Sequence, residues 1–241
     1  MKNLLIVLMI LPLLLSAADL YLVGDSTMQD YRSQFAPMTG WGTSLKGLVK
    51  PDVKVTNLAM GGRSSKSFLT EKRWEPVLKE GKPGDFVIIQ FGHNDAVTGA
   101  ANLYRSTNAE VTFKLYLKIY IAEARANGLI PVLCTKTAVC RFRNGEVFDV
   151  SIPHVTACRE VAAETGCDLV DLNAYAHAKF PVMGEPAVKK LYMILEKGES
   201  SNYPDGKTDT CHLRDKGAEF YAEGFVELAR EQNLKIAELF K

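Results

Sequence analysis

The sequence predicts an α/β fold: one three-layer, doubly wound domain built around a five-stranded parallel sheet. Two observations lead to this prediction. Short β-rich runs alternate with helical stretches at a spacing of roughly 35 residues, which is long enough for a strand–helix unit. Several runs are apolar on successive residues, as residues 86–91 are, and this pattern is typical of a central parallel strand that is covered on both faces.

Five runs are expected to form the sheet. They are residues 20–23, 53–58, 86–91, 130–135 and 168–172. The clearest helix covers residues 110–127, because Gly128 and then Pro131 end it. A second helix is expected over residues 155–165, and apolar residues at helical spacing predict a last helix over residues 216–233.

Residues 1–18 are predicted to be a cleavable signal peptide, followed by the folded domain at residues 19–241. Lys2 supplies the positive start, residues 4–15 are apolar, and small residues then offer a cleavage site. An uncleaved membrane anchor is the alternative, but the apolar run is short and Pro12 interrupts it. We therefore expect a secreted or periplasmic protein with no membrane association after cleavage.

The charge balance argues against partners that need a strongly charged surface. The chain has 29 basic and 28 acidic side chains, and the predicted leader contains one of the lysines and no acidic residue. The folded domain is therefore close to neutral. Nothing in this balance indicates binding to nucleic acid or to an anionic membrane. The 223 residues that remain after an 18-residue leader suit one large α/β domain.

Four polar clusters interrupt the scaffold, and the first three follow strands directly. They are residues 24–27, 57–64, 91–95 and 209–212, the last of which precedes the final helix. The carboxyl ends of parallel strands meet at one edge of a sheet, where open α/β sheets place their ligand sites. The loop before the last helix can return to this edge, so we expect all four clusters to lie together.

Each cluster supplies a part that a nucleophilic serine needs. Ser26 lies on the turn after the first strand, where its hydroxyl can face a substrate, but a serine is a weak nucleophile without a base. His212 is the expected base, and Asp209 is expected to orient it. The Ser26 and Gly62 backbone N–H groups and the Asn94 side chain are the expected oxyanion donors.

Taken one at a time, these motifs are weak. Most Gly-Asp-Ser triplets are turns, and most Asp-x-x-His sequences are surface coincidences. Residues 61–67 superficially look like a phosphate loop, but they lack its Gly-Lys-Ser/Thr ending. The four clusters in one order, three of them at strand ends, favour a serine hydrolase.

These clusters resemble the sequence blocks of the SGNH, or GDSL, hydrolase superfamily. The matching stretches are Gly24-Asp-Ser-Thr27, Gly62-Arg-Ser64, Gly92-His-Asn-Asp95 and Asp209-x-x-His212. The four residues that characterise the superfamily blocks, Ser, Gly, Asn and His, match Ser26, Gly62, Asn94 and His212. The resemblance implies the SGNH-hydrolase form of the flavodoxin-like fold.

More narrowly, the chain is similar to the rhamnogalacturonan acetylesterases of carbohydrate esterase family 12. This similarity rests on Gly24-Asp-Ser-Thr-Met28, Gly40-Trp-Gly42, Asn57-x-Ala-x-x-Gly-Arg-Ser64, Phe91-Gly-His-Asn-Asp95 and His212 followed by Gly217-Ala218. These stretches span almost the whole predicted domain. One departure is Cys211, where that family often has threonine before the histidine.

Three further residues are candidate substrate contacts: Asp25, Arg63 and His93. Asp25 has a second interpretation, in which it pins the turn at Ser26. Arg63 is the best candidate to meet an acidic sugar, and a structural ion pair is the alternative. His93 either lines the pocket or braces the loop of Asn94. Residues such as His154, His177, Trp41 and Trp74 are expected to be structural.

The cysteines allow one disulfide prediction. The chain has five: Cys134, Cys140, Cys158, Cys167 and Cys211. No pair has Cys-x-x-Cys spacing, so a zinc knuckle or a thioredoxin-type motif is not expected. Cys140 lies just past the fourth strand and Cys211 lies beside His212. Both positions belong to the same edge of the sheet, so we expect these two to form the disulfide.

Together these observations predict a secreted serine esterase that removes acetyl groups from a plant cell-wall polysaccharide. The favoured substrate is rhamnogalacturonan or another pectin. Xylan or other sugar acetates are the next choice. We expect a monomer that needs no cofactor and no metal. Two other classes stay open: a metal-dependent hydrolase and a non-catalytic carbohydrate-binding protein. The metal-dependent hydrolase would use Asp25, His93, Asp95, Asp209 and His212.

Overall fold

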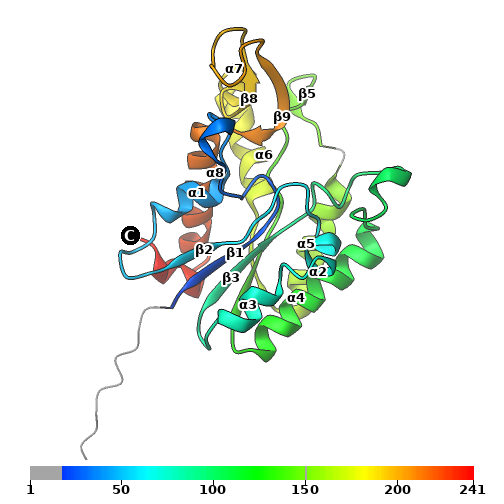
Figure 1. Cartoon of the computed structure of the whole chain (residues 1–241), viewed down its shortest axis with the longest axis vertical. Helices are drawn as coiled ribbons and strands as arrows, with labels where there is room; N and C mark the ends of the chain where they lie inside the picture. Colours follow the sequence, from blue (N-terminus) through cyan, green and yellow to red (C-terminus); the bar gives the residue numbers. More distant parts are fainter. Residues whose placement is uncertain (1–17, 150) are drawn as a thin grey trace, which may run out of the picture.

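A computed structural model describes residues 18–149 and 151–241, which form a three-layer α/β domain (Figure 1). The central sheet has five parallel strands in the order β2-β1-β3-β4-β7. The strands are β1 (Leu20–Gly24), β2 (Val55–Asn57), β3 (Phe86–Gln90), β4 (Ile130–Cys134) and β7 (Asp168–Val170). The predicted fold class is confirmed. The predicted signal peptide lies, apart from residue 18, outside the described residues.

Alternate residues of each central strand pack into two separate apolar cores. Leu22 and Ile88 point to one face of the sheet, whereas Val23 and Ile89 point to the other. All four side chains are fully buried. This burial on both faces explains why the strand sequences are apolar without alternation.

The described residues form eight α-helices, seven of which cover the two faces of the sheet. They are α1 (Trp41–Lys46), α2 (Ser65–Thr70), α3 (Glu75–Glu80), α4 (Lys114–Ala126), α5 (Ile152–Thr165), α6 (Leu172–Met183), α7 (Glu185–Lys189) and α8 (Asp215–Glu231). Helices α2, α3, α4 and α5 pack on one face, and α1, α6 and α8 pack on the other, whereas α7 lies beside β8 at the top of the view (Figure 1).

The three predicted helices are present, with small differences at their ends. The helix predicted over residues 110–127 begins as a π-helical turn, Ala109–Phe113, before α4 continues it. Asn108 begins this turn, because its side-chain oxygen accepts from the N–H groups of Glu110 and Val111, both at 3.0 Å. Helices α5 and α8 correspond to the other two predictions.

Two antiparallel hairpins were not expected from the sequence. One consists of β5 (Phe142–Arg143) and β6 (Glu146–Val147), and the other of β8 (Tyr192–Leu195) and β9 (Lys207–Leu213). The fourth polar cluster, predicted to lie in a loop, is therefore part of strand β9. Only Leu213 of β9 is fully buried, so this strand lacks the apolar run that marks the strands of the main sheet.

A buried chain of hydrogen bonds joins the ends of β1 and β3 to helix α1. Asp25 Oδ1 accepts from the Thr27 hydroxyl at 2.8 Å, and that hydroxyl accepts from Gln90 Nε2 at 3.2 Å. Gln90 Oε1 in turn accepts from Trp41 Nε1 at 2.8 Å. None of these four side chains is accessible beyond 1 %. The turn that follows β1 is therefore held in place by buried hydrogen bonds.

The predicted disulfide between Cys140 and Cys211 is wrong: all five cysteines, each of which lies in the described chain, are free thiols. The two segments are neighbours, because the Cys140 N–H donates to the Thr210 carbonyl at 2.8 Å. However, the Cys140 side chain packs into the apolar core beside α1, α6 and α8. The Cys211 sulfur lies 3.6 Å from His93 Nδ1 instead.

Of the helices in residues 18–149 and 151–241, none has the length and apolar character needed to cross a membrane.

We predict that Trp41→Phe lowers the free energy of unfolding by about 1–3 kcal/mol, because it leaves the buried Gln90 oxygen without its donor. Trp74→Phe is the matched control. Trp74 Nε1 donates to Glu123 Oε2 at 2.8 Å, and the exposed Glu123 carboxylate can bind water instead. Urea unfolding measures both losses. Equal losses in the two variants would contradict the importance of the buried chain.

Candidate active site

The nucleophile candidate Ser26 lies on a tight turn that its neighbours hold in place. The Asp25 carbonyl accepts from the N–H groups of Met28 and Gln29, both at 3.2 Å. A side chain at Gly24 would come within 2.8 Å of the Gln90 carbonyl oxygen, so the close approach of β1 and β3 here requires glycine. The Ser26 side chain reaches the surface, with 9 % of the residue exposed.

Asp25 is part of the turn and does not contact the surface. It is fully buried, and its Oδ1 accepts from both the N–H and the hydroxyl of Thr27. Burial raises the pKa of this carboxyl, and within the described residues its Oδ2 has no hydrogen-bond partner. Its contacts match the second interpretation, in which Asp25 pins the turn, and its burial gives no support to a contact with substrate.

Ser26, His212 and Asp209 form a continuous hydrogen-bonded line. Ser26 Oγ lies 3.0 Å from His212 Nε2, and His212 Nδ1 lies 2.8 Å from Asp209 Oδ2. An ionised Asp209 can only accept, so the Nδ1 atom carries the proton and Nε2 is left free to accept from the serine. The sequence predicted that these three side chains act together, and in the structure they are in hydrogen-bond contact.

The Asp209 carboxylate is built to stay ionised. Burial would raise its pKa, but hydrogen bonds from the His212 ring, the His212 N–H and the Cys211 N–H outweigh burial and lower the pKa. Both N–H groups lie 3.0 Å from Oδ1. One oxygen of the carboxylate therefore binds the backbone of β9 and the other binds the imidazole.

The three residues that carry the candidate oxyanion donors, Ser26, Gly62 and Asn94, line one hollow. In the part of the chain that the structure describes, neither the Ser26 nor the Gly62 N–H donates to a protein acceptor. Gly62 has a φ of +78°, a conformation that favours glycine. The Asn94 amide nitrogen donates to the Arg63 carbonyl at 3.0 Å, and its second hydrogen remains for an oxyanion.

The sequence prediction missed Arg105, which fixes the orientation of the Asn94 amide. Its Nη1 donates to Asn94 Oδ1 at 3.1 Å and lies 3.4 Å from the Gly62 carbonyl. Its Nε and Nη2 both bind Asn102 Oδ1. Arg105 belongs to no strand end and no motif, so no signal in the sequence singled it out.

Asp95 joins the second and third polar clusters below the surface. It accepts from the Gly92 N–H at 3.1 Å, from the Ser65 N–H and hydroxyl, and from the Thr107 hydroxyl at 3.2 Å. Burial raises the pKa of this fully enclosed carboxyl to about 7, although the Ser65 and Thr107 hydrogen bonds act in the opposite direction. Asp95 therefore holds the Asn94 loop against the start of α2.

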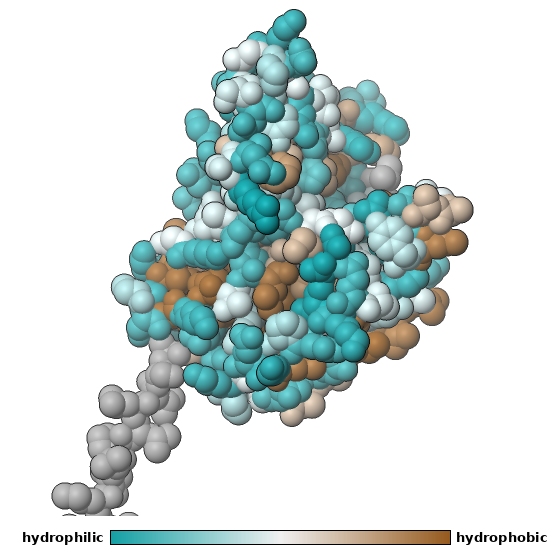
Figure 2. Space-filling view, in the orientation of Figure 1, coloured by the Kyte–Doolittle hydropathy of each residue, from teal (hydrophilic) through white to brown (hydrophobic). Residues whose placement is uncertain are grey.

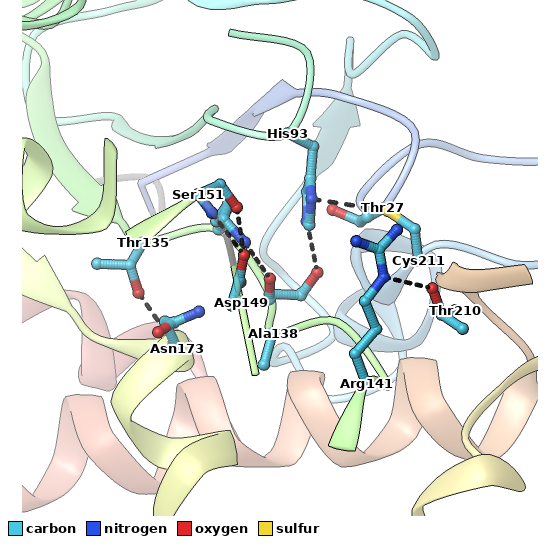
Figure 3. Close-up of polar contacts among 12 residues, drawn as sticks. Thr27, His93, Thr135, Ala138, Arg141, Asp149, Ser151, Asn173, Thr210 and Cys211 are labelled. Atoms are coloured by element: carbon cyan, nitrogen blue, oxygen red, sulfur yellow. Dashed lines mark hydrogen bonds and ion pairs between the residues drawn. The ribbon is translucent and has the colours of Figure 1, made fainter. Parts of the chain in front are cut away.

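His93 braces the site from one side. Its Nε2 lies 3.0 Å from the Thr137 hydroxyl, and its other nitrogen faces the Cys211 sulfur (Figure 3). Burial, with the nearby Lys136 ammonium, lowers the pKa of His93. The imidazole is therefore neutral at physiological pH. It braces the site through Thr137 and Cys211, and it also lines a hollow beside Ser26, so both interpretations of His93 match the structure in part.

Arg63 forms the ion pair that was its alternative interpretation. Its Nε lies 3.0 Å from Glu71 Oε2, and its Nη1 donates to the Gly61 carbonyl at 2.9 Å. Arg63 lines neither of the hollows beside Ser26 that are described next. The structure therefore gives no support to a contact between Arg63 and an acidic sugar.

Two surface hollows meet at the nucleophile, and both are lined by Ser26, Gly62 and His212. One, of about 530 Å³, extends towards the β8–β9 connection and is called here the aromatic hollow. Its other lining residues include Tyr31, Phe35, Asn202, Tyr203 and Lys207. The other, of about 460 Å³, is called the arginine hollow. It continues past Asn94 and His93 to Arg105, Arg141, Asp149 and Cys211.

The five side chains of the metal-dependent alternative are not arranged as a ligand set. Asp25 and Asp95 are buried, and their carboxylates accept hydrogen bonds from the hydroxyls of Thr27 and Ser65. The Asp209 carboxylate is hydrogen-bonded to the His212 ring. Across the described ranges, no three His, Cys, Asp or Glu side chains converge in a way that could hold a metal ion. The geometry matches a serine-based mechanism instead.

Comparison with known proteins agrees with this geometry. Residues 22–220 match the GDSL-like Lipase/Acylhydrolase family. The chain belongs to this family. It is thus an acylhydrolase, a carboxylic ester hydrolase. The contacts among Ser26, His212 and Asp209 are consistent with this chemistry.

The chain is 34 % identical over 215 residues to the rhamnogalacturonan acetylesterase RhgT of Bacillus subtilis (strain 168), and the match covers 87 % of this chain and 90 % of that protein. It is 35 % identical to the probable rhamnogalacturonan acetylesterase YesY of the same organism, covering 92 % and 97 %. The solved structure of the Bacillus subtilis YXIM protein superimposes with a TM-score of 0.76 at 27 % identity. That match covers 90 % of this chain and 57 % of the longer protein.

We predict that Ser26→Ala lowers kcat for ester hydrolysis at least about 1000-fold while the fold is retained, because the variant has no nucleophile. Ser44→Ala on α1, whose hydroxyl lies outside both hollows, is the control. A phosphonate or sulfonyl-fluoride reagent should label Ser26 in the wild type, as mass spectrometry of peptides would show. Activity above a few per cent in Ser26→Ala would overturn the assignment of the nucleophile.

A second prediction concerns pH. Asp209 has a lowered pKa, so it stays ionised as the pH falls from neutrality, and only His212 must lose a proton to act as base. The logarithm of kcat/KM should therefore rise with pH with a slope of one on the acid side. Asp209→Asn should lower kcat by roughly 100-fold to 10,000-fold, because it releases the imidazole. A slope of two, or full activity in Asp209→Asn, would contradict this assignment.

Proposed function

We propose that this chain is an exported serine esterase that removes O-acetyl groups from rhamnogalacturonan, a pectic polysaccharide of plant cell walls. The observation that carries the proposal is the line Ser26–His212–Asp209 beside three convergent oxyanion donors. One relative, at 34 % identity, is a rhamnogalacturonan acetylesterase, and another, at 35 %, is a probable one, which supports the choice of polysaccharide. The predicted leader supports export.

The proposed reaction begins when Ser26 Oγ attacks the acetyl carbonyl carbon and its proton passes to His212 Nε2. The carbonyl oxygen becomes an oxyanion, which the Ser26 N–H, the Gly62 N–H and the free Asn94 N–H stabilise. One such donor contributes about 3 kcal/mol to the transition state. Asp209 stabilises the imidazolium that forms meanwhile, because its carboxylate accepts from Nδ1–H.

The tetrahedral intermediate then collapses to an acetyl-enzyme. His212 Nε2–H gives its proton to the sugar oxygen, the ester bond to the sugar breaks, and the sugar leaves with a free hydroxyl. Water attacks the acetyl-Ser26 carbonyl as His212 takes its proton, and acetate is released. Every group in this scheme comes from one chain, so the reaction requires no residue of a second copy.

The surroundings of Ser26 favour a large polar substrate. The nucleophile lies between two open hollows and not at the end of a closed apolar tunnel, as a site for a long acyl chain would require. The face shown in Figure 2 is mainly hydrophilic around the β8–β9 hairpin, at the top of the view. A polysaccharide chain can therefore cross the site with sugars on both sides of the acetylated one.

We predict that the purified protein releases acetate faster from acetylated rhamnogalacturonan than from acetylated xylan or acetylated mannan at equal acetyl concentration. An enzymatic acetate assay on this panel gives the rates, and Ser26→Ala is the blank. Preference for xylan would replace the proposed substrate by the runner-up. Binding to acetylated polysaccharide with no acetate release from any of the panel would favour the non-catalytic alternative.

A further inference from the structure

A small apolar surface lies beside the arginine hollow, at residues 100–104. Leu103 and Tyr104 are 66 % and 56 % exposed, and the alanines at positions 100 and 101 are exposed as well. The segment projects at the right of the view in Figure 1, and Figure 2 shows tan and brown residues at the same edge. Exposure of adjacent apolar side chains adds nothing to folding stability, so this surface is a candidate for binding. It is called here the 100–104 platform.

Hydrogen bonds hold the backbone of the platform in one conformation. The Asn102 carbonyl accepts from the N–H groups of Arg105 at 2.9 Å and Ser106 at 2.8 Å, and the Asn102 side chain accepts from Arg105 Nη2 at 2.8 Å. From helix α2, Lys66 Nζ donates to the Leu103 carbonyl at 2.6 Å. The exposed side chains are therefore presented by an ordered segment, which lowers the entropy lost when a ligand binds.

Arg105 connects the platform to the active site. Its guanidinium carbon lies over the Tyr104 ring, 5.5 Å from the centroid. The same guanidinium donates to Asn94 Oδ1 at 3.1 Å and lines the arginine hollow. One side chain therefore separates the Tyr104 ring from an expected oxyanion donor. Ala96 and Val97, which precede the platform in the chain, also line this hollow, so its wall continues towards the platform.

The size and chemistry of the platform match one sugar ring. Arg105 covers one side of the Tyr104 ring, and the exposed part of the ring remains for a ligand. The C–H face of a pyranose can pack on an aromatic ring while its hydroxyls stay in water. A stable interface between two proteins uses about 20–30 residues on each side, many more than the platform has. The extended substrate is therefore a better occupant than a second copy of the chain.

We propose that the 100–104 platform is a distal subsite, at which a pyranose ring of the polysaccharide beyond the acetylated sugar stacks on Tyr104. The inference rests on the proposed function, which supplies a polysaccharide substrate. It deepens that function, because the arginine hollow becomes the path along which the substrate chain runs from Ser26 to Tyr104. The contact is made to the C–H face of the ring, so it requires no charge on the sugar.

The test compares a long substrate with a small one. Acetylated rhamnogalacturonan can reach the platform, whereas para-nitrophenyl acetate has the same acetyl group and no sugar. The measured quantity is the ratio of kcat/KM for acetate release from the polysaccharide to that from the small ester. Tyr104→Ala should lower this ratio by about fivefold or more, mainly through a higher KM for the polysaccharide, because the stacking contact is lost.

Two further variants make the test specific. Tyr104→Phe keeps the aromatic ring and should keep the wild-type ratio. Val111→Ala is the matched control, because Val111 is 65 % exposed on the turn before α4 but lines neither hollow. Its ratio should equal that of the wild type. Acetylated oligosaccharides of increasing length should show no effect of Tyr104→Ala when short and a growing effect as the chain lengthens. Circular dichroism and urea midpoints verify that each variant is folded.

The outcomes separate the subsite from the proposed function. An unchanged ratio in Tyr104→Ala, or an equal loss on both substrates, would overturn the subsite and leave the proposed function intact. A dimer in light scattering that Tyr104→Ala dissociates would assign the platform to a second copy and also overturn the subsite. No acetate from rhamnogalacturonan, with release from acetylated xylan, would overturn the proposed function and the subsite together. A ratio that falls in Tyr104→Ala and is kept in Tyr104→Phe and Val111→Ala would establish the subsite.

Discussion

The hydrogen-bonded chain from Asp25 through Thr27 and Gln90 to Trp41 is the constraint on which the site depends. It lies at the carboxyl ends of β1 and β3, where no water can replace a missing partner. In such surroundings a lost hydrogen bond leaves an unsatisfied polar group, so the turn has one stable geometry. This buried network therefore holds the turn on which Ser26 lies.

The remaining parts of the site are also held in place by polar side chains that contact them. Asp95 holds the loop of Asn94 against the start of α2, and Arg105 sets which way the Asn94 amide faces. Lys136 and Asp149 form an enclosed ion pair behind His93. An oxyanion site needs donors that are already aimed before the reaction, because reorientation during the reaction would cost energy. The contacts of Asp95 and Arg105 orient the Asn94 donor before the substrate binds.

The sequence was informative where one physical signal dominated. Continuous apolar runs such as residues 86–91 predicted the buried strands, because both faces of the sheet are covered. Clusters at strand ends then placed Ser26, Gly62 and Asn94 at one edge. Strand β9 was missed because most of its side chains are half-exposed and polar, so its sequence lacks the apolar run of a buried strand. Arg105 and Arg141 were missed because tertiary contacts, and no local pattern, bring them to Ser26.

The acid–base pair occupies one short strand. Asp209, His212 and the two N–H groups that hold the carboxylate all belong to β9, so the pair is a self-contained unit. The connection from β8 to β9 contains Asn202 and Tyr203 of the aromatic hollow, but none of the hydrogen bonds that orient the imidazole. Insertions or exchanges in residues 196–206 can therefore reshape one wall of the cleft without disturbing proton transfer. In evolution, this separation lets substrate range diverge while the chemistry is inherited unchanged.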